Sequence, residues 1–231
     1  MRIRVKKRNS RRVFVGANGE RFVRESGITD WMHNKACEQY GRKDIDKDDI
    51  FYYTYGILHY PPYREKYQNN FKKELPRIPL VERYEDFAAF SWAGRELGEL
   101  HCRYEHVKLN DTAQICIKEG TDTSAPNFYD VEKMRPVGTG NFTELRYNDN
   151  ITIKNIPHEA HEYIVNGRSP LGWIIDQYRV KIDREALIKN DPNDWGREHG
   201  NPRYILDLIL RVIEVSVRTM QIVKGLPKVD V

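Results

Sequence analysis

The chain has 231 residues, a formal net charge of +4 and a pI near 8.8. This length allows one domain, or one and a half, with a proper core, and an aromatic content of 11% excludes a disordered chain. The mild basic excess is consistent with a nucleic-acid partner but does not identify one.

Composition also argues against secreted and membrane proteins. The cysteines Cys37, Cys102 and Cys116 are few and unevenly spaced, so we expect no disulfide framework, and a reducing cytoplasm fits. The N-terminus is charged with no apolar run behind it, and no uncharged stretch reaches the length of a membrane span. We therefore expect a cytoplasmic protein without a signal peptide.

A basic arm begins the chain. Alternating apolar residues and the turn-forming residues 17–19 predict a hairpin over residues 11–22. Two interpretations stay open: the arm binds DNA phosphates, or it is a sheet edge kept soluble by its charges. The cations of the arm are Arg2, Arg4, Lys6, Lys7, Arg8, Arg11 and Arg12.

The next element is a helix expected over residues 28–40, capped by Thr29 or Asp30. Its predicted core contacts are Trp31, Ala36 and Tyr40.

The stretch from 48 to 80 combines aromatic rings with cations. An acid-rich start and the apolar spacing predict a helix that stops at Pro61 and Pro62, and a second, basic helix is expected over residues 63–75. The stretch is either a surface that grips a polyanion or an aromatic core helix with a solvated basic back. The pattern alone favours the core interpretation.

A long helix over residues 84–104 and an irregular region over residues 109–153 follow. Gly94 and Gly98 stand four apart on the helix, which indicates that another helix crosses very close. Short strands joined by Gly, Asn, Asp and Ser are predicted in the irregular region. Such loops on a rigid scaffold are where recognition residues usually lie. The strands are expected around Ile115 and over residues 131–137, 143–147 and 151–153.

The C-terminal part is predicted to be helical. Pro157 opens a helix through Val165, Ser169 caps another from Pro170 to Tyr178, and residues 190–202 form a turn-rich linker. The final helix, over residues 204–224, belongs to the core. Its charged residues are expected to form one solvated stripe with two i,i+4 ion pairs: Asp207 with Arg211 and Glu214 with Arg218.

Several long motifs resemble one family. IFYYTYGILHYPPYREKYQNNFKKELPRIPL, from residue 50 to 80, resembles the C-terminal specificity domain of Type ISP restriction-modification enzymes and related helicase-like restriction proteins. The resemblance continues in AGRELGELHCRYE, IPHEAHEYIVNGRSPLGWIIDQYRV and NDPNDW, and in the LP at residues 226–227, and covers most of the chain from about residue 27. It implies a target recognition domain that accompanies a nuclease, a helicase-type ATPase and an adenine methyltransferase.

Motifs that suggest catalysis fail on inspection. YPPY, residues 60–63, looks like the tetrapeptide of amino-methyltransferases, but Tyr60 lacks the side-chain oxygen of Asp, Asn or Ser that holds the amine. VGTGNF, residues 137–142, precedes an expected strand instead of a helix. HEAHE, residues 158–162, has only two residues between its histidines, so the usual zinc spacing is missing. No lysine follows an acidic residue by two positions, and no phosphate-binding ATPase loop is present.

The sequence therefore predicts an α+β fold: a mainly helical scaffold with a small antiparallel β region and irregular recognition loops. We expect a single domain over residues 1–231, made of a basic β arm (1–26), a helical part (27–108), an irregular β and loop part (109–156) and C-terminal helices (157–231). We expect no catalytic residue, no metal and no cofactor.

The predicted partners are double-stranded DNA and linked or separate adenine methyltransferase and helicase-nuclease modules. Lys and Arg side chains are expected to position the DNA backbone, and Asn, Gln and Arg side chains on loops to read base edges in the major groove. Candidates for the backbone are the seven cations of the arm with Lys72 and Lys73. Candidates for base reading are Asn127, Arg135, Asn141, Arg146 and Asn148.

Two alternatives stay open. A structural module that couples the methyltransferase to the ATPase would show an exposed apolar patch and weak DNA affinity. A permuted DNA amino-methyltransferase is the less favoured alternative, because its motifs depart from the required pattern.

Overall fold

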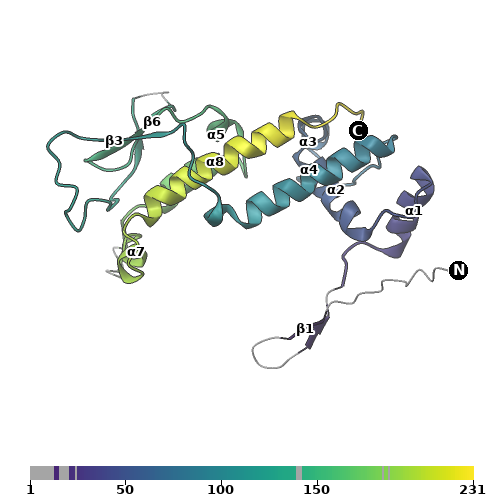
Figure 1. Ribbon diagram of the computed structural model, residues 1–231, viewed down its shortest axis with the longest axis horizontal. Helices are drawn as coiled ribbons and strands as arrows, with labels where there is room; N and C mark the ends of the chain where they lie inside the picture. Colours follow the sequence, from purple (N-terminus) through teal and green to yellow (C-terminus); the bar gives the residue numbers. More distant parts are fainter. Residues whose placement is uncertain (1–12, 16–20, 24, 139–141, 184, 187) are drawn as a thin grey trace, which may run out of the picture. The chain divides into compact units, whose positions relative to one another are not determined.

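The computed structural model describes residues 13–15, 21–23, 25–138, 142–183, 185–186 and 188–231. The chain divides into two compact units, residues 1–94 with 227–231 and residues 95–226. The described residues form helices and a small antiparallel sheet, which confirms the predicted α+β class (Figure 1). None of the helices in these ranges is long and apolar enough to cross a membrane.

The first unit holds a hairpin and the first helices. Its elements are β1 (Val13–Val15), β2 (Arg21–Val23), α1 (Asp30–Tyr40), α2 (Lys47–His59), α3 (Pro61–Tyr67) and the beginning of α4 (Tyr84–Cys102). β1 and β2 pair antiparallel, with Phe14 opposite Phe22, so the predicted hairpin is confirmed. Its turn and the seven cations of the arm lie outside the described residues.

α1 begins as predicted, because the Thr29 side chain accepts a hydrogen bond from the Met32 N–H at 3.2 Å. Ala36 is buried and Tyr40 is half-buried, but the prediction that Trp31 lies in the core is wrong, since Trp31 is 69% exposed. At 100° per residue, Trp31 lies roughly 140° around the helix from Ala36, away from the buried side.

α2 begins at a capping box in which Asp46 accepts from the Asp49 N–H at 2.7 Å and Asp49 accepts from the Asp46 N–H at 3.0 Å. It ends at His59, as the prolines predict. The helix expected over residues 63–75 is instead α3, which begins at Pro61 and ends at Tyr67. Proline fits the first helical turn, and the two asparagines at residues 69–70 favour turns.

The tyrosines of this region form the core of the first unit, which confirms the core interpretation. Tyr53 is fully buried, and Tyr63 is 1% exposed. The Tyr53 hydroxyl donates to the Pro79 carbonyl at 2.6 Å and accepts from the Val81 N–H at 3.1 Å, and burial raises the pKa of this hydroxyl. The Tyr63 hydroxyl donates to the Arg77 carbonyl at 2.9 Å. The tyrosines therefore fasten the segment 77–81 to the helices.

α2 and α4 cross at van der Waals contact. A Cβ added to Gly94 would lie 1.8 Å from the Tyr52 carbonyl oxygen, and one added to Gly56 would lie 2.3 Å from the Phe90 carbonyl oxygen. The prediction that Gly94 marks a close helix crossing is confirmed.

The second unit is built around one sheet and one long helix. Its strands are β3 (Gln114–Ile117), β4 (Arg135–Pro136), β5 (Leu145–Arg146), β6 (Ile151–Lys154), β7 (Lys181–Ile182) and β8 (Lys189–Asn190). Its helices, after the end of α4, are η1 (Tyr104–His106), α5 (Glu159–Glu162), α6 (Pro170–Gln177), α7 (Asp194–Glu198) and α8 (Tyr204–Lys224).

The main sheet has the strand order β3-β6-β5-β4, and all its pairs are antiparallel. The inner face of the sheet is apolar, because Leu145 and Ile153, which lie opposite one another, are buried in the core of this unit. Leu206 and Ile213 of α8 belong to the same core. The predicted strands are thus confirmed, although β4 and β5 are shorter than expected.

α8 has the predicted bounds and lies largely in the core, as predicted, but its charges do not form a solvated stripe. Glu214 is only 7% exposed, because the side-chain amide of Asn110 donates to it at 2.9 Å in the packed interior. Asp207 pairs with Arg203 at 2.7 Å, and Arg211 donates to the Val107 carbonyl at 3.2 Å. Polar groups from the segment before β3 therefore hydrogen-bond with the charged side chains of α8.

Three further bounds depart from the expectation. The long helix predicted to reach Tyr104 ends at Cys102, and Tyr104 begins η1 and is 41% exposed. The helix expected over residues 157–165 is the single turn α5. The linker expected over residues 190–202 contains the end of β8 and all of α7. α6 begins at Pro170 under the predicted Ser169 cap.

Candidate nucleic-acid interface

An open cleft of about 730 Å³ lies on the second unit. It is lined by the segment from Asn127 to Arg135, by Arg146 and the turn after β5, by the β7–β8 ribbon, and by residues from Asp191 to Arg197. These segments are far apart in the sequence, and the outer face of the main sheet brings them together.

Two arginines face one another on that outer face. Leu145 points into the core, so its neighbour Arg146 points outward, and Arg135 of β4 is its direct partner across the strands. Arg146 forms an ion pair with Asp149 at 2.7 Å, whereas Arg135 has no ion pair or side-chain hydrogen bond with any residue that the structure describes. Like charges directly opposite one another are unfavourable unless an anion or an acceptor lies between them.

The structure gathers four of the five predicted base readers in this cleft. Asn127, Arg135 and Arg146 are exposed there, and Asn148 is half-buried. Asn141 lies outside the described residues. The choice of residues by type and loop position therefore finds side chains that share one surface.

Asn148 differs from the other three because its side chain is occupied. Its amide nitrogen donates to the carbonyls of Phe128 at 2.9 Å and Asp130 at 3.0 Å. Its oxygen accepts from the N–H groups of Asn150 at 2.9 Å and Ile151 at 2.8 Å. Asn148 thus fastens the turn after β5 to the segment that carries Asn127.

Asn193 is a supporting residue that the sequence analysis did not identify. It is 7% exposed, its oxygen accepts from the Val131 N–H at 2.9 Å, and its amide donates to the Val131 carbonyl at 2.8 Å. The side chain therefore pairs with the backbone as a neighbouring strand would. The motif NDPNDW, noted only as part of a resemblance, is the available signal for this role.

A network of charges supports the floor of the cleft. Arg197 contacts Asp130 at 2.5 Å, Asp194 at 2.6 Å and Asp191 at 3.6 Å, and Lys189 contacts Asp191 at 3.0 Å. Burial of the Asp191 carboxyl opposes ionisation, but hydrogen bonds from Asn193 and Lys189 outweigh it, so the pKa of Asp191 is lowered.

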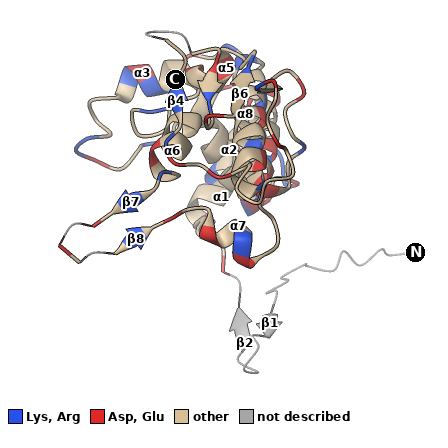
Figure 2. Ribbon diagram, turned by 90° about the vertical axis from the view of Figure 1, so that its left-hand side faces the viewer, with Lys and Arg blue, Asp and Glu red and all other residues tan. Residues whose placement is uncertain are grey.

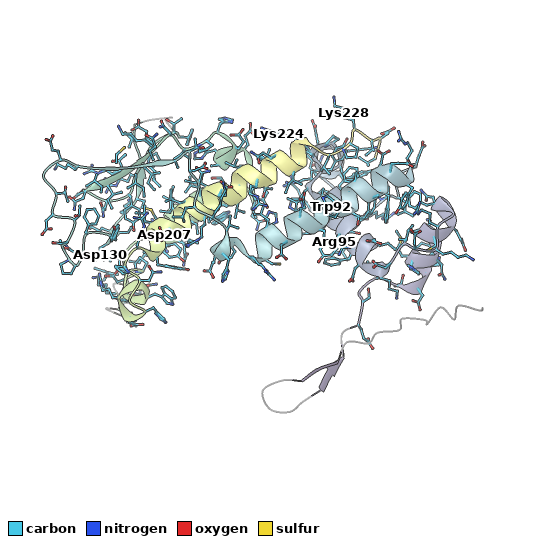
Figure 3. The ribbon with its side chains drawn as sticks, viewed as in Figure 1. Trp92, Arg95, Asp130, Asp207, Lys224 and Lys228 are labelled. Carbon is cyan, nitrogen blue, oxygen red and sulfur yellow. The ribbon has the colours of Figure 1, made fainter. Side chains whose placement is uncertain are left out.

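Asp130 lies beside the first turns of α8, near Asp207 (Figure 3). The buried Tyr147 hydroxyl feels the charge of both carboxylates and donates to the Tyr129 carbonyl at 2.7 Å. Burial, followed by the negative charges of Asp130 and Asp207, raises the pKa of Tyr147. This hydroxyl therefore stays protonated and ties the cleft segment to the core.

The β7–β8 ribbon forms one wall of the cleft and was not predicted. It projects from the rest of its unit (Figure 2). Its strands have only two residues each, with Ile182 opposite Lys189, and all four residues are exposed. Strands this short leave no periodic signal in a sequence.

Among the described residues of the first unit, the predicted contacts to the DNA backbone are Lys72 and Lys73, in the turns after α3. Both side chains are exposed and have no ion pair within the described part of the chain. Next to them is a smaller cavity of about 260 Å³, lined by Tyr67, Phe71 and Arg77 among others. These two lysines therefore belong to a solvent-exposed part of the predicted basic surface.

The motifs that suggested catalysis have structural roles. Tyr60 of YPPY is 5% exposed, and its hydroxyl contacts the backbone of Val229. The His161 ring of HEAHE donates to the Phe142 carbonyl at 2.7 Å. Within the described ranges no group of three His, Cys, Asp or Glu side chains is placed to hold a metal ion. Residues 139–141 of the glycine-rich motif 137–142 lie outside those ranges.

Comparison with known proteins gives one family. The chain matches the family model described as the Type ISP C-terminal specificity domain over residues 4–208. No curated protein sequence matches it.

Three solved structures are similar. One is a nuclease-deletion mutant of the Type ISP restriction-modification enzyme LlaGI in complex with a DNA substrate mimic, with 44% identity and a TM-score of 0.70 over 81% of this chain. The DNA-bound ATP-dependent Type ISP enzyme LlaBIII has 35% identity and a TM-score of 0.75 over 92% of this chain. The DrdV–DNA complex has 27% identity and a TM-score of 0.73 over 95% of this chain. The chain spans only 17%, 12% and 21% of those three chains, respectively.

Proposed function

The chain belongs to the Type ISP C-terminal specificity domain family, and from this premise we propose that it recognises a double-stranded DNA sequence through the cleft of its second unit. The module itself is non-catalytic. It positions an adenine methyltransferase and a helicase-nuclease, either linked to it or on another chain.

The observation that carries this proposal is the pair of arginines on the outer face of the sheet. Arg135 and Arg146 lie directly opposite one another and line the open cleft. Arg146 already pairs with Asp149 at 2.7 Å, whereas the Arg135 guanidinium has no acceptor among the described residues. The O6 and N7 atoms of guanine or a phosphate oxygen supply one. DNA bound to three similar structures supports the same conclusion.

The role assigned to each cleft residue depends on whether its side chain already has a hydrogen-bond or ion-pair partner. The side chains of Arg135 and Asn127 have no partner among the described residues, so they are assigned to guanine and adenine edges, respectively. Arg146 is shared with Asp149 and is oriented by it. Asn148 and Asn193 hold the loops. Lys72 and Lys73 contact backbone phosphates, which adds affinity without sequence preference.

The test is selection of bound duplexes from a random library at moderate salt, followed by binding of the enriched and scrambled duplexes across a salt series. We expect one enriched motif, bound at least about a thousandfold better than scrambled DNA. Equal binding of both duplexes that disappears with salt would overturn the proposal and leave only a basic surface.

Substitutions test whether the cleft residues read the DNA sequence. Arg135→Ala is expected to relax the preference at one position of the motif and to weaken binding by about 1–3 kcal/mol. Arg103→Ala is the matched control, because Arg103 is also an exposed arginine but pairs with Glu99 at 2.9 Å and does not line the cleft. An enriched motif that is the same for Arg135→Ala as for the wild type would exclude Arg135 as a reader.

The second candidate is a module that couples other parts of the enzyme without reading bases. The observation in its favour is the exposure of two large rings in the first unit, Trp31 at 69% and Trp92 at 66%. Surface tryptophans of this kind are typical of protein interfaces. Failure of the selection experiment, with tight binding of the chain to the methyltransferase part, would favour this function.

A further inference from the structure

The β7–β8 ribbon has the form of a groove-reading element. Its residues Lys181, Ile182, Lys189 and Asn190 are all exposed, and its two strands pair only with one another in the described sheets. Antiparallel strands lie about 4.8 Å apart, and the major groove of DNA is about 12 Å wide and admits a two-stranded ribbon. The ribbon is therefore narrow enough to enter that groove.

Hydrogen bonds hold the described residues on either side of β7. The Val180 N–H donates to the Glu132 carbonyl at 3.0 Å, next to the backbone that Asn193 holds. Beyond β7, the Asp183 side chain accepts from the N–H groups of Glu185 and Ala186, both at 2.9 Å. These contacts give β7 and β8 a defined position beside the cleft.

One face of the ribbon lines the cleft and the other does not. Ile182 and Lys189 are cross-strand partners, so their side chains share one face, and both line the cleft. Ile188 is the neighbour of Lys189 and therefore points from the opposite face, which does not line the cleft. Ile182 and Ile188 are both 64% exposed, so neither is explained by packing in the core.

We propose that the β7–β8 ribbon enters the major groove and that Ile182 contacts the C5-methyl group of a thymine in the recognised sequence. This inference rests on the proposed function and adds the element and the base chemistry. Among the groups that bases present in the major groove, the thymine methyl is the apolar one, so an exposed isoleucine beside Asn and Arg readers complements it. Lys189 lies on the same face, and its ion pair with Asp191 at 3.0 Å fixes it beside Ile182.

The experiment uses the full chain and the duplex motif enriched by selection. Each thymine of the motif is replaced in turn by uracil, which removes only the methyl group. We expect one position at which wild-type affinity falls about fourfold, the value for one buried methyl group. With Ile182→Ala, the thymine and uracil duplexes should bind equally at that position.

Ile188→Ala is the matched control, because it removes the same side chain at the same exposure from the other face. It should retain the fourfold thymine preference, and both variants should unfold at the wild-type urea concentration. Loss of the preference in both variants, or a motif with no uracil-sensitive thymine, would overturn the inference while leaving the proposed function intact. Failure to enrich any motif would overturn both.

Discussion

Two asparagines in the cleft show how burial decides what a side chain does. Asn127 is exposed and its side-chain amide is free among the described residues, whereas Asn193 is 7% exposed and pairs with both backbone groups of Val131. A buried backbone group that loses its partner costs about 1–3 kcal/mol. The same residue type therefore serves recognition at one position and the scaffold at the other.

Asn193→Ala is expected to lower the free energy of unfolding by roughly 2–4 kcal/mol, because it leaves the N–H and the carbonyl of Val131 without partners. Asn127→Ala should change the free energy of unfolding by less than about 0.5 kcal/mol, as a surface substitution. Urea unfolding followed by circular dichroism measures both values. Similar effects of the two substitutions would contradict the assigned roles.

Asp191 makes the stability of the cleft depend on pH. Its pKa is lowered in the folded chain, so it contributes stability above the unfolded pKa of about 4, and this contribution is lost as the pH falls through the folded value. The free energy of unfolding of the wild type should therefore fall more steeply below about pH 4 than that of Asp191→Asn. Urea unfolding at several acidic pH values tests this, and parallel pH profiles would contradict it.

At the scale of the residue, the sequence indicates which residue types suit base reading, but it does not show which side chains already have hydrogen-bond partners in the fold. Asn127, Arg135 and Arg146 could be chosen because Asn and Arg on loops have the chemistry of base readers. The commitment of Asn148 to four backbone groups depends on where two distant loops meet, which no local pattern contains. Glu214 was assigned to solvent because the sequence does not reveal that Asn110 lies against it.

At the scale of the element, the crossing of α2 and α4 leaves no room for a side chain at Gly94. Because a Cβ on Gly94 would lie 1.8 Å from a carbonyl oxygen of α2, the two helix backbones would have to separate. Gly94→Ala should lower the free energy of unfolding by about 3 kcal/mol or more, despite the higher helix propensity of alanine. Gly27→Ala is the control, since nothing lies within 4 Å of its added Cβ.

Thermal unfolding by calorimetry distinguishes the two glycine variants. Gly27→Ala should keep the wild-type midpoint within about 2 °C, whereas Gly94→Ala should lower it by about 6 °C or more. A Gly94→Ala variant as stable as the wild type would show that the helices can move apart without cost.

Local signals predicted those elements whose ends are set by their own residues. The caps at Thr29 and Ser169 and the acid-rich start of α2 are local signals, and α1, α2 and α6 begin near the predicted residues. β7, β8 and α7 are too short for periodicity to show, and distant contacts such as that between Val180 and Glu132 fix their places. The boundary between the two units falls inside the continuous helix α4, where no composition change marks it.

At the scale of the whole molecule, the proposed contacts divide into those that depend on sequence and those that depend on salt. Neutralising one phosphate contributes about 0.9 to the slope of log affinity against log salt. The double variant Lys72→Ala/Lys73→Ala should therefore reduce the magnitude of this slope by about 1.8 and leave the enriched motif unchanged. Arg135→Ala should instead change the motif and retain most of the slope.

Fluorescence anisotropy with the enriched duplex across a salt series, together with a repeated selection for each variant, measures both quantities. The contrast is informative because the lysines lie in the first unit and Arg135 lies in the second. A double variant with the wild-type slope would show that the turns after α3 do not reach the DNA. A double variant with a new motif would show that the first unit also reads bases, because loss of phosphate contacts alone weakens all sequences equally.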